Sequence, residues 1–186
     1  MTILRVEGLN KQYPAFCLRD VSFSIEEGHV MGLIGRNGAG KTTTIKSILR
    51  LVRPDGGTVQ FLGKPLDLDA SALRREAGYV SGDLCYYPRK RLSQLTAVTK
   101  SFYPSWDDKK YEALLHRFSL DETKRVCELS AGMKVKYQLA CALSHGAKLL
   151  ILDEPTSGLD PVSRDDLLDL LRTLCEQGGV SILFST

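Results

Sequence analysis

A glycine-rich run ending in lysine and threonine is the part of this sequence with the clearest chemistry. Residues 35–42 read Gly-Arg-Asn-Gly-Ala-Gly-Lys-Thr and fit G-x-x-x-x-G-K-[ST] at every fixed position. The glycines let successive backbone N–H groups point at one centre, and a following helix would add partial positive charge. We therefore expect a phosphate-binding loop formed by Gly35, Arg36, Asn37, Gly38, Ala39, Gly40, Lys41, Thr42 and Thr43.

Three side chains of this loop have separate expected roles. Lys41 would contact the β- and γ-phosphates of a nucleoside triphosphate, and the Thr42 hydroxyl would bind Mg²⁺. Thr43 could reach the α-phosphate. The alternative is an ordinary strand-to-helix turn that carries a surface lysine, which the complete motif and its flanks disfavour.

A second acidic motif supplies what hydrolysis still needs. Residues 149–152 form an apolar run that ends in Asp153 and Glu154, so both carboxylates should project from the carboxyl edge of a buried parallel strand. Asp153 would hold Mg²⁺ or its water, and Glu154 would polarise an attacking water. Alone, the pair could be a solvated strand end. After a phosphate loop, it predicts Glu154, Lys41 and Asp153 as the catalytic set.

The guanine reader of a GTPase is missing from the sequence. Its only Asn-Lys pair, Asn10-Lys11, precedes the loop and has Tyr13 where that motif needs aspartate. Guanine specificity therefore has no visible basis.

Composition predicts one ordinary globular domain. The chain has 186 residues, of which 43% are hydrophobic and 25% charged, and a net charge of +3, too mild for a dedicated nucleic-acid binder. No apolar run reaches the roughly 18 residues of a membrane span, which predicts a cytosolic chain. The five cysteines are widely spread without a Cys-x-x-Cys pair, so we expect reduced, mostly buried thiols.

Hydrophobic periodicity predicts an α/β order of elements. A strand at 30–34 leads into the loop, followed by a helix whose apolar stripe is Ile45, Ile48, Leu49 and Val52. Strands are expected at 2–6 and 21–25, broken by Gly8 and Pro14, and at 58–62, 78–81 and 180–185, with a brief helix at 73–76. Helical patterns fill residues 84–144.

Capping residues mark two helix starts in the second half. Asp107 should cap one helix, and Asp160 with Pro161 should open another whose core face is Leu167, Leu168, Leu171 and Leu174. The helix that begins near Ser130 should bury Val135, Leu139, Ala142 and Leu143.

The order of motifs resembles the ATP-binding subunit of ABC transporters. Leu129-Ser-Ala-Gly-Met133 stands between the phosphate loop and the acidic pair, and Thr156-Ser-Gly-Leu-Asp160 follows that pair. The resemblance covers nearly the whole chain. It implies a P-loop NTPase (RecA-like) core with an N-terminal antiparallel β lobe and an inserted helical subdomain, within one domain 1–186: core and β lobe at 1–83 and 145–186, helical subdomain at 84–144.

The same resemblance implies ATP and Mg²⁺ as cofactors and a head-to-tail dimer. Ser130 and Gly132 would cap the γ-phosphate of ATP held by a second copy or a paralogous subunit; Ser130 can also simply cap its helix. Tyr13 resembles the aromatic residue that stacks on adenine, although a sheet-packing tyrosine is nearly as good a reading. Asp160 resembles the residue that connects the two composite sites.

Several positions depart from the family pattern. Ala131 and Met133 stand where the signature usually has glycine and glutamine, and Gly82 aligns with a glutamine that senses Mg²⁺. The adjacent Asp83 could replace that glutamine as an oxygen ligand, or be a solvated loop residue. The family's switch histidine normally follows a strand ending such as Phe184-Ser-Thr186, so we expect a truncated subunit with uncovered sheet surface.

The sequence therefore predicts an ATPase subunit that drives a separate membrane permease, peripheral on the inner face of the cell membrane, with no nucleic-acid partner. The permease would dock on the helical lobe, where 86–91 and 101–106 interleave aromatics with cations; Phe102, Tyr103 and Trp106 could equally be core. Residues 101–106 resemble the corresponding stretch of bacterial exporter-type ATPases. Alternatives are an ATP-dependent dimerisation module with little hydrolysis, and a soluble non-transport ABC ATPase.

Overall fold

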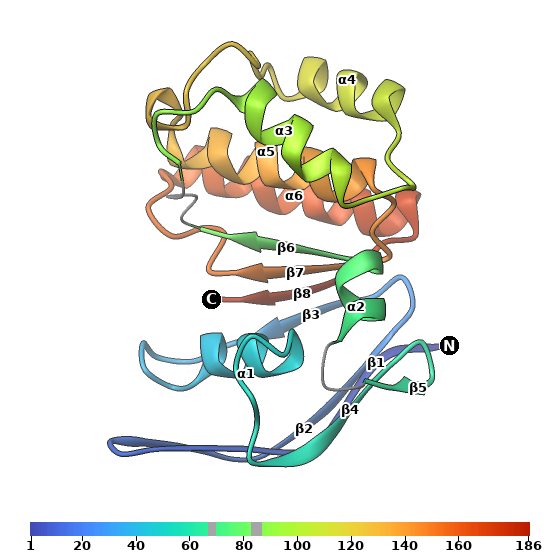
Figure 1. Ribbon diagram of the computed structural model, residues 1–186. Coiled ribbons are helices and arrows are strands. Elements are labelled where there is room, and N and C mark those ends of the chain that lie inside the picture. Colours follow the sequence, from blue (N-terminus) through green and yellow to red (C-terminus); the bar gives the residue numbers. More distant parts are fainter. Residues whose placement is uncertain (67–69, 83–86) are drawn as a thin grey trace.

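An antiparallel sheet forms the outer layer of the molecule. The computed structural model describes residues 1–66, 70–82 and 87–186. The sheet has the order β2-β1-β4-β5 and packs below α1 (Figure 1), with the strands β1 (Thr2–Tyr13), β2 (Phe16–Glu26), β4 (Gly56–Phe61) and β5 (Lys64–Pro65). Gly8 does not break its strand, contrary to expectation. It adopts a φ of +58° within a register shift between Val6 and Leu9, so the long hairpin bends and continues.

A second sheet of four parallel strands lies at the centre. Its order is β3-β8-β7-β6 (Figure 1), with β3 (Val30–Leu33), β6 (Ala77–Ser81), β7 (Leu149–Asp153) and β8 (Ser181–Ser185). All five residues of β7 are buried, as its apolar run predicts. Because the strands are parallel, their carboxyl ends meet at one edge, and the loops that leave this edge can converge on a ligand.

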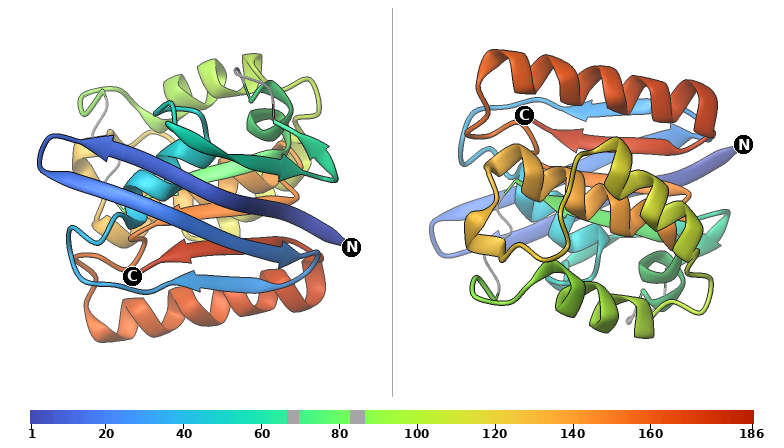
Figure 2. Two further views of the ribbon diagram at one scale, coloured as in Figure 1. Left: turned by 90° about the horizontal axis from the view of Figure 1, so that it is seen from below. Right: turned by 90° about the horizontal axis from the view of Figure 1, so that it is seen from above.

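Helices cover the parallel sheet on both faces (Figures 1 and 2). On the face toward the antiparallel sheet lie α1 (Lys41–Ile48) and α2 (Ser71–Glu76). On the other face lie α5 (Ala131–Ser144) and α6 (Pro161–Gly178), with α3 (Leu92–Ser101), α4 (Asp108–Arg117) and the short 3₁₀ helix Val126–Glu128 further out. The predicted α/β class and P-loop core are therefore confirmed.

The predicted helix caps on α4 and α6 are present. The Asp107 side chain accepts a hydrogen bond from the Lys110 amide at 3.0 Å, and the Asp160 side chain accepts one from Ser163 at 3.0 Å. Asp160 has a pKa below its usual range because the Ser163 hydroxyl and amide both donate to its ionised form.

The two faces of β7 belong to two apolar clusters. Leu150 and Leu152 pack with residues of α4, α5 and α6, whereas Leu149 and Ile151 pack with α1 and the antiparallel sheet. The helical segment between β6 and β7 thus shares its core with the central sheet and does not have one of its own. This continuity ties α5, which follows Ser130, firmly to the strand that carries Asp153.

Two expectations about burial and helix length are wrong, and one alternative left open is decided. The first helix ends at Ile48, because Arg50 takes a φ of +56°, so Val52 lies outside it. Leu168 is 39% exposed, since it follows Leu167 by about 100° around α6 and turns away from the core face. Phe102 is 71% exposed and is not part of the core.

The cysteines are less buried than expected. Of the four within the described residues, only Cys141 is buried, and Cys127 is exposed. Burial raises the pKa of the Cys141 thiol to about 12, which keeps it protonated and unreactive. Cys85 lies outside the described residues. Across the described parts of the chain we find no helix with the length and apolar character that a bilayer crossing requires.

Candidate functional site

The glycine-rich loop connects the carboxyl end of β3 to the start of α1. Gly38 and Gly40 adopt φ values of +83° and +100°, a left-handed region that favours glycine. A Cβ atom at Gly40 would also lie 2.7 Å from the Phe16 ring. The backbone conformation therefore requires glycine at both positions, and close packing against Phe16 requires it again at Gly40. The expected strand-loop-helix context of the motif is present.

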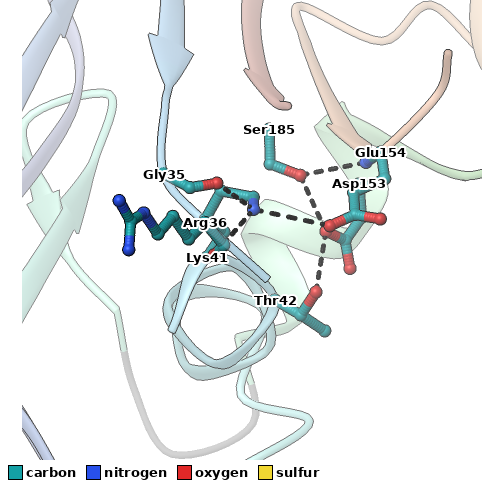
Figure 3. Close-up of polar contacts among 7 residues, drawn as sticks. All are labelled: Gly35, Arg36, Lys41, Thr42, Asp153, Glu154 and Ser185. Atoms are coloured by element: carbon teal, nitrogen blue, oxygen red, sulfur yellow. Dashed lines mark hydrogen bonds and ion pairs between the residues drawn. The ribbon is translucent and has the colours of Figure 1, made fainter. Parts of the chain in front are cut away.

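Lys41 is buried and points back along its own loop (Figure 3). Its Nζ donates hydrogen bonds to the carbonyl oxygens of Gly35 at 2.7 Å and Arg36 at 3.3 Å. Nζ also lies 3.5 Å from Glu154 Oε1. The guanidinium of Arg36 extends away from this group of residues. Asn37 and Ala39 are exposed. These three residues would therefore contribute to a phosphate site through their backbone.

The two acidic residues reach the loop because β7 ends at the same sheet edge as β3. Asp153 Oδ1 accepts a hydrogen bond from the Thr42 hydroxyl at 3.0 Å, across 111 residues of sequence. A hydroxyl and a carboxylate oxygen at this separation are the hard oxygen donors that Mg²⁺ prefers. The residues present therefore fit a magnesium ion, which Thr42 and Asp153 would hold.

Tyr79 on β6 borders the same carboxylate. Burial raises its pKa to about 12, and the charge of Asp153 together with a hydrogen bond to it act in the same direction. The phenol is therefore protonated at neutral pH and able to donate to Asp153. The sequence gave no sign that Tyr79 would contact Asp153.

Two cavities flank the loop. One of about 450 Å³ is lined by Thr42, Asp153 and Glu154 together with Lys46 of α1 and Ala131 and Lys134 of α5. The other, of about 420 Å³, is lined by the loop from Gly38 to Thr43, by Glu154, and by Ala15 and Phe16. Thr42 of the loop and Glu154 of the acidic pair thus border both cavities, which leaves room for a phosphate chain beside them.

Phe16, and not Tyr13, is the aromatic side chain that lines the second cavity. Tyr13 stands at the end of β1, its ring tilted against that of Phe16 with centroids 6.5 Å apart, and Lys11 Nζ lies 5.6 Å from its centroid. The hairpin turn between β1 and β2 separates the two rings, and the sequence gave no reason to prefer the residue after the turn.

Ser130 and Gly132 lie at the start of α5. The Ser130 hydroxyl accepts a hydrogen bond from the Met133 amide at 3.2 Å, which confirms it as an N-cap, and the side chain is exposed. Among the hydrogen bonds of the described residues, none joins Ser130 or Gly132 to the phosphate loop. Ser130 is thus exposed at the start of α5, while Ala131 beside it borders the cavity that Thr42 and Glu154 also line.

Gly82, the residue after β6, lies against the backbone that follows β7. Gly82 packs so closely on the chain after β7 that a Cβ atom would lie 2.4 Å from the Glu154 carbonyl oxygen. Position 82, where the resemblance leads us to expect a glutamine, therefore has no room for a side chain in this arrangement. Asp83, the expected substitute ligand, lies outside the described residues.

Sequence reasoning missed three residues of this site, namely Phe16, Tyr79 and Ser185. Ser185 is buried at the end of β8, where its hydroxyl lies 2.9 Å from Asp153 Oδ1 and 2.9 Å from the Glu154 amide nitrogen (Figure 3). A serine at the end of an apolar strand beside the acidic strand is a weak signal, because strand order cannot be read from the sequence.

Comparison with known proteins places these features in a family. A family model described as ABC transporter matches residues 18–157. The ABC transporter ATP-binding protein YtrB of Bacillus subtilis is 34% identical over 169 residues, covering 91% of this chain and 58% of that protein. A solved structure described as an ATP binding subunit of an ABC transporter is 33% identical, with a TM-score of 0.83 over 99% of this chain and 79% of that one.

Other relatives differ in what their names say of transport. The phosphonates import ATP-binding protein PhnC 1 of Rhodopseudomonas palustris is 32% identical, with coverage of 97% of this chain and 71% of that protein. The Nod factor export ATP-binding protein I of Ralstonia nicotianae is 35% identical, with coverage of 97% and 58%. The chain thus spans less than two thirds of the length of some of these relatives.

Proposed function

This chain belongs to the ABC transporter ATP-binding family, and on that premise we propose that it binds Mg-ATP, hydrolyses it and thereby powers a separate membrane permease. The observation that carries the proposal is the meeting of Lys41 and Thr42 with Asp153 and Glu154 at one sheet edge, within 3.0 to 3.5 Å. These are a phosphate-binding pair and an acidic pair from segments more than 100 residues apart.

The chemistry follows from what each group can do. Backbone N–H groups of residues 35–43 bind the phosphates, and Lys41 turns from the Gly35 carbonyl toward the β- and γ-phosphates. Thr42 and Asp153 would hold Mg²⁺, which when bound neutralises charge on the phosphate oxygens. Glu154 orients the attacking water and accepts its proton. Its distance of 3.5 Å from Lys41 keeps this carboxylate beside the γ-phosphate position.

We assign the adenine-stacking role to the Phe16 edge of the second cavity, with Tyr13 as the alternative. Phe16 is half-buried and lies against Gly40 of the loop, so a base stacked on its ring would be continuous with the phosphates. Replacing Phe16 by alanine should then weaken ATP more than replacing Tyr13 does.

We further propose that Ser130 and Gly132 complete the site of a second subunit, either a copy of this chain or a paralogue. The exposed α5 N-terminus presents free N–H groups and the positive end of the helix dipole, which suits a γ-phosphate held by another molecule. The chain would then divide into a core and β lobe at 1–83 and 145–186 and a helical lobe at 84–144.

The helical lobe offers an exposed apolar face for the permease. Val98 and Phe102, four residues apart on and just after α3, are 60% and 71% exposed. Tyr103 instead stacks on His145, and Trp106 packs against the core. Docking here would hold the chain at the cytoplasmic face of the membrane. We favour export because 101–106 resembles exporter ATPases, although relatives carry both import and export names.

One specific observation supports a second candidate, an ATP-dependent dimerisation module with little hydrolysis. Gly82 has no side chain where the family places its Mg²⁺-sensing glutamine, and its packing leaves no room for one. In this reading the chain closes on ATP but turns it over slowly.

Molar mass by light scattering tests these proposals, measured for Glu154→Gln in Mg-ATP, in Mg-ADP and without nucleotide. A dimer that forms only in Mg-ATP is the expected result, because the variant should bind without hydrolysing. Lys41→Ala is the control that should abolish the dimer. Phosphate release by the unsubstituted protein separates the candidates: turnover above that of Glu154→Gln by about 10²-fold or more supports the ATPase, and equal rates support the module.

A further inference from the structure

We propose that Ser185 and Gly82 act as a clamp on the peptide bond between Asp153 and Glu154, which makes Ser185 a positioning residue for the hydrolytic site. The inference rests on the proposed function for its catalytic meaning. Ser185 is fully buried and would not touch ATP, so any effect must pass through the acidic pair.

The hydroxyl of Ser185 is committed in both of its hydrogen-bonding roles (Figure 3). Its Oγ accepts from the Glu154 amide at 2.9 Å and donates its single proton to Asp153 Oδ1 at 2.9 Å. Asp153 cannot donate when ionised and the amide cannot accept, so only one orientation of the hydroxyl satisfies both bonds. The same Asp153 oxygen also accepts a hydrogen bond from the Thr42 hydroxyl. Ser185 therefore fixes the carboxylate that faces Thr42.

Gly82 holds the opposite end of the same peptide bond. Its amide donates to the Asp153 carbonyl oxygen at 3.0 Å, while Ser185 holds the Glu154 amide on the other side. The two partners come from strands on either side of β7, since β6 leads into Gly82 and β8 ends at Ser185. The peptide plane is therefore fixed by both neighbours at once.

The backbone just beyond this peptide needs such support. Glu154 has a φ of +49°, a left-handed conformation that non-glycine residues adopt at a cost. Its carbonyl oxygen packs where a Cβ atom of residue 82 would stand. This turn directs the Glu154 carboxylate back toward Lys41, 3.5 Å away, instead of along the strand direction. Loss of the Ser185 hydroxyl would leave the partly buried Glu154 amide without its hydrogen-bond partner and free the turn to relax.

Two substitutions on β8 make a matched comparison. Ser181 is also fully buried, and its hydroxyl accepts from a backbone amide, that of Gly28 at 2.9 Å, at the opposite end of the strand. Ser185→Ala and Ser181→Ala therefore remove the same group from the same strand, and only the first lies at the acidic pair. Ser185→Thr keeps the hydroxyl, and Ser185→Cys serves if Ser185→Ala does not fold.

The first readout is hydrogen exchange of the Glu154 amide, followed by NMR, which needs no nucleotide. We expect protection to fall at least about tenfold in Ser185→Ala, and to stay near the original value in Ser181→Ala and Ser185→Thr. Unchanged protection in Ser185→Ala overturns the clamp. The thiol of Ser185→Cys donates and accepts hydrogen bonds weakly, so we expect an intermediate loss of Glu154 amide protection. Full protection in this variant would likewise overturn the clamp.

The second readout is turnover and the Mg²⁺ dependence of ATP binding. Ser185→Ala should lower kcat and raise the Mg²⁺ concentration for half-maximal binding by about 10- to 100-fold, with ATP affinity in the absence of Mg²⁺ retained. Ser181→Ala should keep kcat, and Ser185→Thr should restore most of it. Equal kcat loss in both alanine variants reduces Ser185 to a structural role. If the unsubstituted protein binds no ATP, the proposed function fails, and the exchange measurement still decides the clamp.

Discussion

Replacement of Glu154 by glutamine should change ATP binding and ATP hydrolysis in opposite directions. Glu154 holds Lys41 in an ion pair of 3.5 Å, and the ATP phosphates must compete with it for the same ammonium group. Glutamine keeps the size of the side chain and removes the charge. ATP affinity should therefore rise while turnover falls, because the proton acceptor is lost together with the competitor.

The size of the affinity gain follows from the exposure of the pair. At an effective dielectric constant of about 20, charges separated by this distance attract by about 5 kcal/mol, which is an upper limit. The Lys41 side chain is 7% exposed, but that of Glu154 is 41% exposed and well screened. A net value of about 1 kcal/mol is more appropriate to such a pair, equivalent to roughly fivefold tighter ATP binding. Turnover should fall by about 10² to 10⁴.

Isothermal titration with Mg-ATP measures the first quantity and phosphate release the second. Glu176→Gln is the matched control, since it removes an equal charge from an exposed pair with Arg172 on α6, near Val30 at the far end of β3 from the loop. Both affinity and turnover should be unchanged in this variant. Weaker ATP binding in Glu154→Gln, or turnover within tenfold of the original, would refute the assignment of Glu154 as the residue that pairs with Lys41 and accepts the proton.

Three further predictions concern the metal, the core and pH. Thr42→Val keeps the side-chain shape but loses the hydroxyl that faces Asp153, so the Mg²⁺-dependent part of ATP affinity should fall about tenfold or more in titrations with and without Mg²⁺. Leu150→Ala should lower the free energy of unfolding by about 2–5 kcal/mol in urea, because Leu150 is fully buried in β7, whereas Leu168→Ala on the exposed side of α6 should cost less than about 1 kcal/mol. Burial lowers the pKa of His145, so the folded state resists its protonation; unfolding free energy should fall as pH drops from about 6.5 through the folded-state pKa. His145→Gln should flatten that part of the pH profile, and an unchanged slope would contradict the assignment.

Much of the site could be predicted from the sequence because its parts are local. Gly38 and Gly40 take the left-handed angles that their motif requires, and Asp107, Ser130 and Asp160 cap the helices that follow them. In each case the residue acts on backbone within three or four positions, so neighbouring residue types carry enough information.

The misses share a different cause. Phe16 reaches the loop through the hairpin turn of β1 and β2, and its place beside Gly40 depends on how the antiparallel sheet packs on α1. Gly8 was expected to end a strand, but pairing on both sides carries the strand through a bulge. Tertiary pairing overrode the local preference in both regions.

The sequence by itself determined which residues could bind phosphate and Mg²⁺, and which strand would be buried. Only the tertiary structure decided that Ser185 stands beside Asp153 and that Gly82 closes on Glu154 from the other side. The physical reason lies in the strand order β3-β8-β7-β6. Buried parallel strands all have similar apolar sequences, so the sequence does not specify which strands pair, and the pairing decides which strand ends meet.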